Sequence, residues 1–131
     1  MIVAFFDMQD QSNHLNGVTV GDDKKLSSLL DSLQRRAPFF AELRGENGYN
    51  LVIGIGKVGC AQYGHGEGDP PYLVALADTP YAGEDYDGFL AGGTLTPVPR
   101  RFIMPFAKII GIAQYFRNTG ARSPDVSWEE I

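Results

Sequence analysis

The sequence predicts an α+β domain, in which an antiparallel sheet of about five to six strands is packed on one face by two main helices. Two observations predict it. Several short apolar segments with strand-like alternation follow one another, and the two segments with helical periodicity lie on either side of this run. A chain of 131 residues with 44% apolar residues also suffices for one core. We therefore expect a single domain over residues 1–131, without repeats.

The first elements are a strand over residues 2–6 and a helix after a polar loop. Leu26, Leu29, Leu30 and Leu33 recur at the spacing of one helical face. Asp22 or Asp23 is suited to cap the N-terminus of this helix, and Pro38 ends it. The first helix is thus expected between these limits.

The middle of the chain predicts consecutive strands. Residues 39–55 alternate in apolar character on either side of Asn47-Gly48, which is a typical hairpin turn. Further strands are expected over 58–63, 72–77 and 89–98, the last interrupted at Gly92-Gly93. Residues 64–71, GHGEGDPP, require a loop.

The last helix is expected over residues 105–119. Phe106, Ile109, Ile110, Ala113 and Phe116 lie on one face of it, and Gly120 and Pro124 follow its end.

The tail after this helix carries the only tryptophan of the chain, Trp128. We expect it to fold back and pack Val126 or Trp128 against the domain, because a buried indole can hold a segment that would otherwise fray. Direct contact of Trp128 with a partner is the alternative. Glu129 is expected either to bond nearby backbone or to reach the partner.

Composition excludes some functions. The net charge of −5 argues against binding nucleic acid, since phosphate backbones require clustered Lys and Arg. No apolar run is long enough to span a membrane. The single cysteine, Cys60, permits no internal disulfide and suits a reducing compartment. We therefore expect a cytoplasmic protein.

Three motifs resemble chemical sites but lack the context that such sites require. Residues 54–59, GIGKVG, spell a dinucleotide-binding fingerprint, but the segment that follows cannot form the required helix, so a tight turn between antiparallel strands is favoured. Cys60 and His65 lack a third group to orient a nucleophile, and a core cysteine is favoured. His65, Glu67 and Asp69 stand on a glycine-rich loop that is not preorganised for a metal. We expect no catalytic residue, metal or cofactor.

Charge segregation is the clearest functional signal. No Lys or Arg occurs between Lys57 and Arg100, whereas acidic residues gather there, chiefly in two loops, of which the second also carries Tyr81 and Tyr86. This surface is either a solvated acidic face or a docking site for a basic protein, in which tyrosines contribute rigid contact area. The candidate binding residues are Glu67, Asp69, Asp78, Tyr81, Glu84, Asp85, Tyr86 and Asp87.

The C-terminal half resembles the bacterial polymorphic-toxin immunity proteins of the first immunity family. The shared features are a Tyr-led strand, a Gly-Thr turn, a late helix ending in Thr-Gly, and a Pro before a terminal Trp-Glu. The resemblance covers residues 70–131, and the first half matches only in its order of helix then strands. The matching residues are Tyr72, Gly93, Thr94, Pro105, Phe116, Thr119, Gly120, Pro124, Trp128 and Glu129.

The resemblance implies a protein that binds and blocks a neighbouring toxin, often a nucleic-acid deaminase, rather than an enzyme. A deaminase that handles nucleic acid needs a basic channel, which acidic loops can occupy. A small hydrolase or ligand-binding protein that uses the Tyr- and carboxylate-rich loops is the alternative, and a structural assembly module with an apolar patch is another. Whether the chain forms homo-oligomers stays open.

Overall fold

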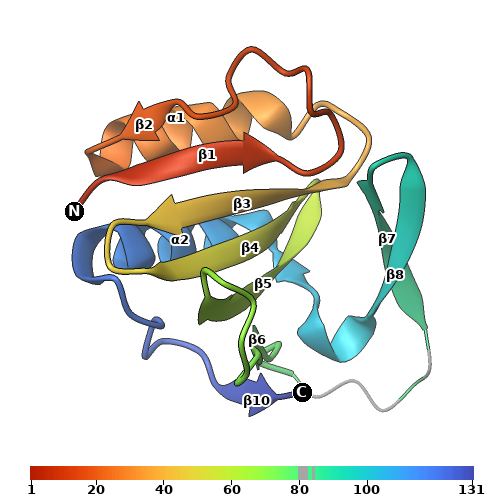
Figure 1. Ribbon diagram of the computed structural model, residues 1–131. Coiled ribbons are helices and arrows are strands. Elements are labelled where there is room, and N and C mark those ends of the chain that lie inside the picture. Colours follow the sequence, from red (N-terminus) through yellow and green to blue (C-terminus); the bar gives the residue numbers. More distant parts are fainter. Residues whose placement is uncertain (80–82, 84) are drawn as a thin grey trace.

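A computed structural model describes residues 1–79, 83 and 85–131, and it has the predicted α+β architecture (Figure 1). Seven strands follow one another across the sheet in the order β10-β6-β5-β4-β3-β1-β2. The strands are β1 (Val3–Asp7), β2 (Thr19–Val20), β3 (Phe39–Gly45), β4 (Tyr49–Ile55), β5 (Val58–His65), β6 (Leu73–Ala75), β7 (Tyr86–Ala91), β8 (Thr94–Pro99), β9 (Met104–Pro105) and β10 (Trp128–Glu130).

The sheet contains more strands than the five to six expected. Most of the additional ones are very short: β2 and β9 have two residues each, and β10 has three. Segments of two or three residues are too short to show an alternation of apolar and polar residues, so they can be identified only from the strands with which they pair. The neighbouring strands are antiparallel, except for a single parallel bridge between Phe39 of β3 and Leu90 of β7.

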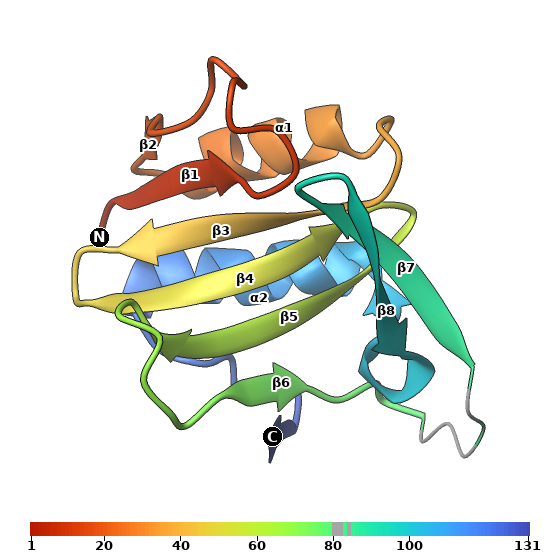
Figure 2. The ribbon, with the colours of Figure 1, turned by 45° about the vertical axis from the view of Figure 1, so that its right-hand side comes forward.

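Both helices lie on the same face of the sheet: in the view of Figure 2, α2 lies behind β3, β4 and β5, and α1 lies behind and above β1. Helix α1 (Asp23–Leu33) is capped by the side chain of Asp22, which accepts a hydrogen bond of 2.8 Å from the backbone N–H of Lys25. It buries Leu26, Leu30 and Leu33. The first helix therefore begins at one of the two predicted caps.

Helix α2 (Phe106–Thr119) ends at Gly120, whose φ of 74° is the left-handed conformation that favours glycine. Its buried face carries Ile109, Ala113 and Phe116, as predicted, but Ile112 rather than Ile110 completes it. The buried stripe is therefore shifted toward Ile112, because α2 packs against α1 as well as against the sheet.

The segment predicted as one interrupted strand over 89–98 is a hairpin of β7 and β8. Gly92 and Gly93 both have positive φ, 56° and 84°, which suits a tight two-residue turn. In Figure 2 the hairpin crosses the end of the sheet on the face opposite to the helices. Phe89 is buried beneath it, with its ring centroid 5.3 Å from that of Phe40.

The glycines of the GIGKVG motif serve close packing rather than a phosphate. They connect β4 to β5 as an antiparallel hairpin, in which Gly54 pairs with Cys60. A methyl group on Gly59 would meet the carbonyl oxygen of Gly54 at 2.4 Å and the side chain of Ile109 at 2.8 Å. The motif is thus a turn between antiparallel strands, as the sequence predicts, and α2 packs on it.

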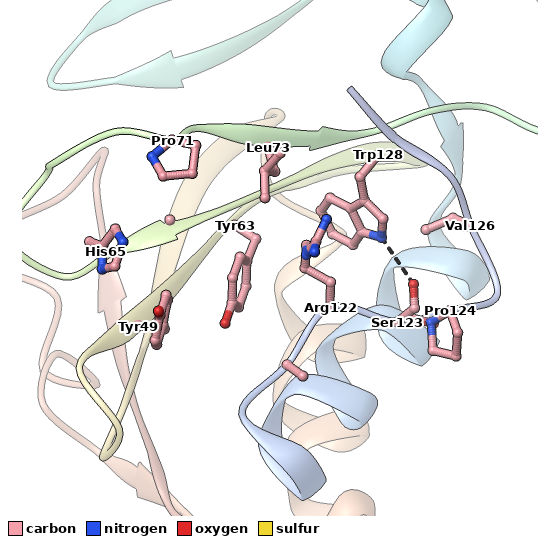
Figure 3. Close-up of a pocket in the computed structure, with 12 residues that line it drawn as sticks. Tyr49, Tyr63, His65, Pro71, Leu73, Arg122, Ser123, Pro124, Val126 and Trp128 are labelled. Carbon is pink, nitrogen blue, oxygen red and sulfur yellow. Dashed lines mark hydrogen bonds between the residues drawn. The ribbon is translucent and has the colours of Figure 1, made fainter. Parts of the chain in front are cut away.

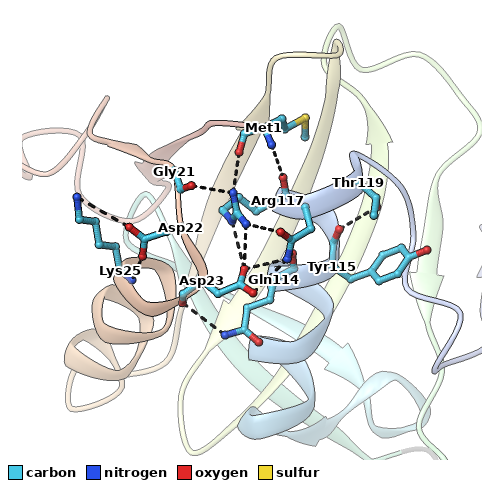
Figure 4. A network of polar contacts seen from close by, with 10 residues as sticks. Met1, Gly21, Asp22, Asp23, Lys25, Gln114, Tyr115, Arg117 and Thr119 are labelled. Carbon is cyan, nitrogen blue, oxygen red and sulfur yellow. Dashed lines mark hydrogen bonds and ion pairs between the residues drawn. The ribbon is translucent and has the colours of Figure 1, made fainter.

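A buried arginine ties the N-terminal strand and the loop before α1 to α2 (Figure 4). Arg117 is 8% exposed, and its Nη1 donates hydrogen bonds to the carbonyl oxygens of Met1 at 3.0 Å and Gly21 at 2.9 Å. The amino group of Met1 in turn donates to the carbonyl oxygen of Arg117. These contacts connect segments that are almost a whole chain length apart in sequence.

Candidate functional site

The described parts of the two predicted acidic loops lie at opposite ends of β6 (Figure 2). Glu67 and Asp69 are exposed on the loop between β5 and β6. Asp78 and Asp85 are exposed near β7, and Asp87 is half-buried within β7. Tyr81 and Glu84, two of the predicted binding residues, lie outside the described residues.

Three of the candidate carboxylates have basic partners that the sequence places elsewhere. Arg100, in the short 3₁₀ helix Arg100–Phe102, lies 3.7 Å from the carboxylate of Asp85 and 3.3 Å from that of Asp87. Lys108 of α2 lies 3.0 Å from the carboxylate of Asp78. The acidic segment between positions 57 and 100 is thus partly neutralised by basic side chains that follow it in the sequence.

The outward face of the β7–β8 hairpin exposes large apolar side chains. Tyr86 is 56% exposed and Leu95 is 63% exposed. The register pairs Tyr86 with Pro99 and Leu90 with Leu95, so residues 86, 88 and 90 share a face with residues 95, 97 and 99. Tyr86, the exposed Pro97 and Leu95 therefore form one surface beside Asp85, which we call the hairpin surface.

A second candidate site is an open pocket of about 640 Å³ near the other end of the sheet (Figure 3). We call it the aromatic pocket. Its floor is a row of rings on neighbouring strands: His65 and Tyr49 have centroids 4.7 Å apart, and Tyr49 and Tyr63 are stacked at 5.1 Å. The antiparallel register places Tyr49 directly opposite His65, with Tyr63 diagonal to it.

The C-terminal tail forms the other wall of the aromatic pocket. Trp128 and Val126 pack against the core, and the Trp128 ring meets Tyr63 edge-on at 6.5 Å. The indole Nε1 donates a hydrogen bond of 2.9 Å to the carbonyl oxygen of Ser123. Trp128 also belongs to β10, which pairs with β6, so both its backbone and its ring are held in place.

Electrostatics inside the aromatic pocket act on Tyr63. Burial raises the pKa of its phenol, and the neighbouring Tyr49 adds to this effect, while the positive charge of Arg122 opposes it. The Tyr63 hydroxyl donates a hydrogen bond of 3.0 Å to the carbonyl oxygen of Gly120. Tyr63 therefore stays protonated and fixed at neutral pH.

Glu129 points elsewhere. Its carboxylate lies 3.2 Å from Nη2 of Arg101, and both side chains are about half exposed. The bond to nearby backbone that the sequence left open is therefore replaced by an ion pair to a side chain.

Cys60 is a core residue, as predicted. It is 5% exposed, and burial raises the pKa of its thiol to about 12 although a hydrogen bond with Gly54 counteracts the shift. His65, at the far end of the same strand, contacts Tyr49 with its ring tilted by 32°. Among the described residues, no three His, Cys, Asp or Glu side chains are grouped so that they could hold a metal ion.

The sequence pattern did not single out the aromatic pocket. Its rings come from β4, β5 and β10, and only the strand register brings them together. One signal was available: continuing the β4–β5 hairpin away from its turn aligns Tyr49 with His65.

No known protein family and no curated protein matches the sequence. No helix in residues 1–79, 83 or 85–131 has the length and apolar character that crossing a membrane requires.

Proposed function

We propose that this chain is an immunity protein. It binds a cognate toxin domain of the nucleic-acid deaminase class in the bacterial cytoplasm and blocks it by occluding its basic active-site groove. It acts by binding and not by catalysis, and it needs no cofactor. The resemblance of residues 70–131 to the first immunity family supports this proposal, as does the net charge of −5.

The observation that carries the proposal is the exposure of Tyr86 between two carboxylates. A tyrosine that leaves 56% of its surface in water, next to the exposed Leu95, is typical of an interface anchor. Asp85 and Asp87 flank it in sequence: the exposed Asp85 lies beside the hairpin surface, and Asp87 adds a second negative charge on the opposite face of β7. A basic groove would find both apolar contact and opposite charge on the hairpin surface.

The ion pairs of Asp85 and Asp87 with Arg100 are compatible with this role. The side chains of Asp85 and Arg100 are 64% and 46% exposed. Exposed pairs of this kind contribute about 0–1 kcal/mol to stability. A lysine or arginine of the toxin can therefore compete with Arg100 for these carboxylates at little cost.

Binding kinetics against the toxin domain encoded directly upstream of this chain's gene test the proposal. The double variant Asp85→Asn, Asp87→Asn should slow association severalfold and reduce its salt dependence, because opposite charges mainly steer the encounter. Tyr86→Ala should raise the dissociation rate about tenfold or more, because central aromatic anchors act on complex lifetime.

The matched control is the double variant Asp31→Asn, Asp125→Asn. It removes the same charge from exposed positions on α1 and on the tail loop, away from the hairpin surface. Association as slow as in the Asp85 and Asp87 variant would show that only net charge matters. Absence of binding by the parent protein, together with unprotected cells, would refute the immunity function itself.

A small ligand-binding protein or hydrolase that uses the loops near β7 is the second candidate. The observation that favours it is an open hollow of about 650 Å³, into which Asp78, Asp87, Arg100 and Lys108 converge. Mixed charges at the mouth of a hollow suit a small polar ligand. Saturable stabilisation of the protein against heat by a single compound from a metabolite panel, lost in Lys108→Met, would support this candidate.

A further inference from the structure

The aromatic pocket contains a cation that has no anionic partner among the described residues. Arg122 follows the end of α2, and Figure 3 shows its side chain rising toward the rings of Tyr63 and Trp128. Arg122 forms neither an ion pair nor a hydrogen bond with any residue in the described ranges 1–79, 83 and 85–131. Arg117, by contrast, has both carboxylate and carbonyl acceptors. The Arg122 guanidinium is therefore available to an external acceptor.

The described lining of the pocket contains a positive charge and no negative one. The chain carries 16 acidic residues against 11 basic ones, yet none of the described residues that line the pocket carries a carboxylate. Three of its polar groups have no hydrogen-bond partner among the described residues. These are the guanidinium of Arg122, the imidazole of His65 and the hydroxyl of Tyr49. All three can donate to an anion.

The shape of the pocket selects for a flat group. Tyr49 and Tyr63 stack with an angle of 11° between their planes, and Trp128 stands nearly upright beside them at 67° to Tyr63. These walls are rigid, because the Tyr63 hydroxyl and the Trp128 indole are both held by carbonyl oxygens of the segment after α2. A planar ring can lie against such walls, and a volume of about 640 Å³ is within the usual range for small-molecule sites.

We propose that the aromatic pocket binds a small planar anion, namely a ring that carries a carboxylate or a phosphate. The ring lies against Tyr49, Tyr63 and Trp128, and the oxyanion accepts hydrogen bonds from Arg122. A guanidinium recognises either oxyanion through two parallel hydrogen bonds, so both ligand classes share this chemistry. The inference does not depend on the immunity function, because the pocket and the hairpin surface lie on different parts of the sheet.

Trp128 provides the readout. It is the only tryptophan of the chain, so the indole N–H gives a single side-chain signal in a ¹⁵N-correlated NMR spectrum. Two ligands are titrated separately, 4-hydroxybenzoate as the aromatic carboxylate and adenosine monophosphate as the nucleotide. Their uncharged counterparts are 4-hydroxybenzamide and adenosine. At least one anion should shift the indole signal in a saturable way, at least about tenfold more tightly than its counterpart.

The variant Arg122→Met keeps much of the aliphatic side chain and removes the charge. It should weaken binding of the anion about tenfold and leave its uncharged counterpart unaffected. Arg35→Met is the matched control, since Arg35 is an exposed arginine after the end of α1 and outside the pocket. It should bind like the parent. Both positions are exposed, so both variants should fold, and their unchanged amide spectra verify it.

The responding anion distinguishes an aromatic acid from a nucleotide as the natural ligand class. Three results would overturn the proposal: no shift with either anion up to about 10 mM, equal binding of charged and uncharged counterparts, or unchanged binding in Arg122→Met. None of these results would bear on toxin binding, which the kinetic experiment measures separately.

Discussion

Arg117 and Asp23 form the ion pair that joins the two helices, with Nη2 of the arginine 3.2 Å from the carboxylate at the start of α1. The pair is asymmetric, because 10% of the Arg117 side chain is exposed and 50% of the Asp23 side chain is. Arg117 also serves the carbonyl oxygens of Met1 and Gly21, which Asp23 does not contact. The geometry of the guanidinium therefore matters more than its charge.

We accordingly expect Arg117→Lys to destabilise the fold although it keeps the charge. The planar guanidinium of Arg117 donates to Asp23, Met1 and Gly21 at once, and a lysine ammonium cannot reach all three acceptors. At least one carbonyl oxygen therefore loses its donor, at a cost of about 1–3 kcal/mol. Urea unfolding measures the loss. Arg35→Lys, at an exposed position, should be neutral. Equal stability of Arg117→Lys and the parent would show that the carbonyl contacts contribute nothing.

The second prediction concerns Asp7, a carboxylate with no exposed surface that lies 2.8 Å from Nη1 of Arg36. Burial opposes ionisation, but hydrogen bonds from Asn13, Arg36 and the N–H groups of Asp10 and Gln9 together outweigh it and lower the pKa. Such a group stabilises the fold above its unfolded pKa of about 3.9. This stabilisation is lost as the pH falls through the lower, folded pKa.

Asp7→Asn should therefore lose about 1–3 kcal/mol of stability near pH 7, because the amide cannot accept all the hydrogen bonds that the buried carboxylate accepts. The difference from the parent should hold between about pH 5 and 7 and shrink below about pH 4. Urea titrations across this range measure it. Asp31→Asn, an exposed change on α1, is the control and should show no such trend. If the difference in free energy of unfolding did not change with pH, the negative charge of Asp7 would not contribute to stability.

Much of the fold followed from local pattern, and the exceptions have a common physical cause. The first hairpin, both helices and the cap at Asp22 were predictable because alternation, helical periodicity and turn chemistry are all local. Strands β2, β9 and β10 were not, since two or three residues acquire strand geometry only from a partner. The exact buried stripe of α2 depends on α1, which lies far away in sequence.

The candidate sites show the same limit more strongly. The acidic interval and Tyr86 were evident from residue types, but the sequence could not reveal that Arg100 and Lys108 lie beside Asp87 and Asp78. The aromatic pocket depends on the register of β4 with β5 and on the return of the tail. A binding site built from three strands is a tertiary feature, and no single window of sequence contains it.

The third prediction concerns the packing of Trp128. Trp128→Ala should destabilise the protein by about 2–3 kcal/mol, because it removes a partly buried ring and the hydrogen bond to Ser123. Trp128→Phe should retain most of the packing and cost about 1 kcal/mol, mainly through the unpaired carbonyl oxygen of Ser123. Urea unfolding, followed by circular dichroism, measures both. Parent-like stability of Trp128→Ala, combined with loss of toxin binding, would instead make the ring a contact residue.

The fourth prediction is that Cys60 is chemically inert in the folded protein. A thiol whose pKa is raised to about 12 by burial carries almost no thiolate at pH 8, and thiolate is the reactive form. Reaction with Ellman's reagent should be slow and should accelerate with urea as the fold opens. A free-thiol rate in native buffer would contradict the buried position. Above about pH 8.5 the unfolded thiol ionises first, so Cys60 should also make the fold less stable as pH rises.

The strands at the two ends of the seven-strand path bear on solubility. One boundary is β2, with two residues, and the other is β10, in which Glu129 and Glu130 follow Trp128. Open strands can recruit identical strands from other molecules and so begin aggregation, and short length and like charges both oppose this. Two copies that met along β10 would bring four carboxylates together. The tail that closes the pocket thus also discourages the sheet from growing into a fibril.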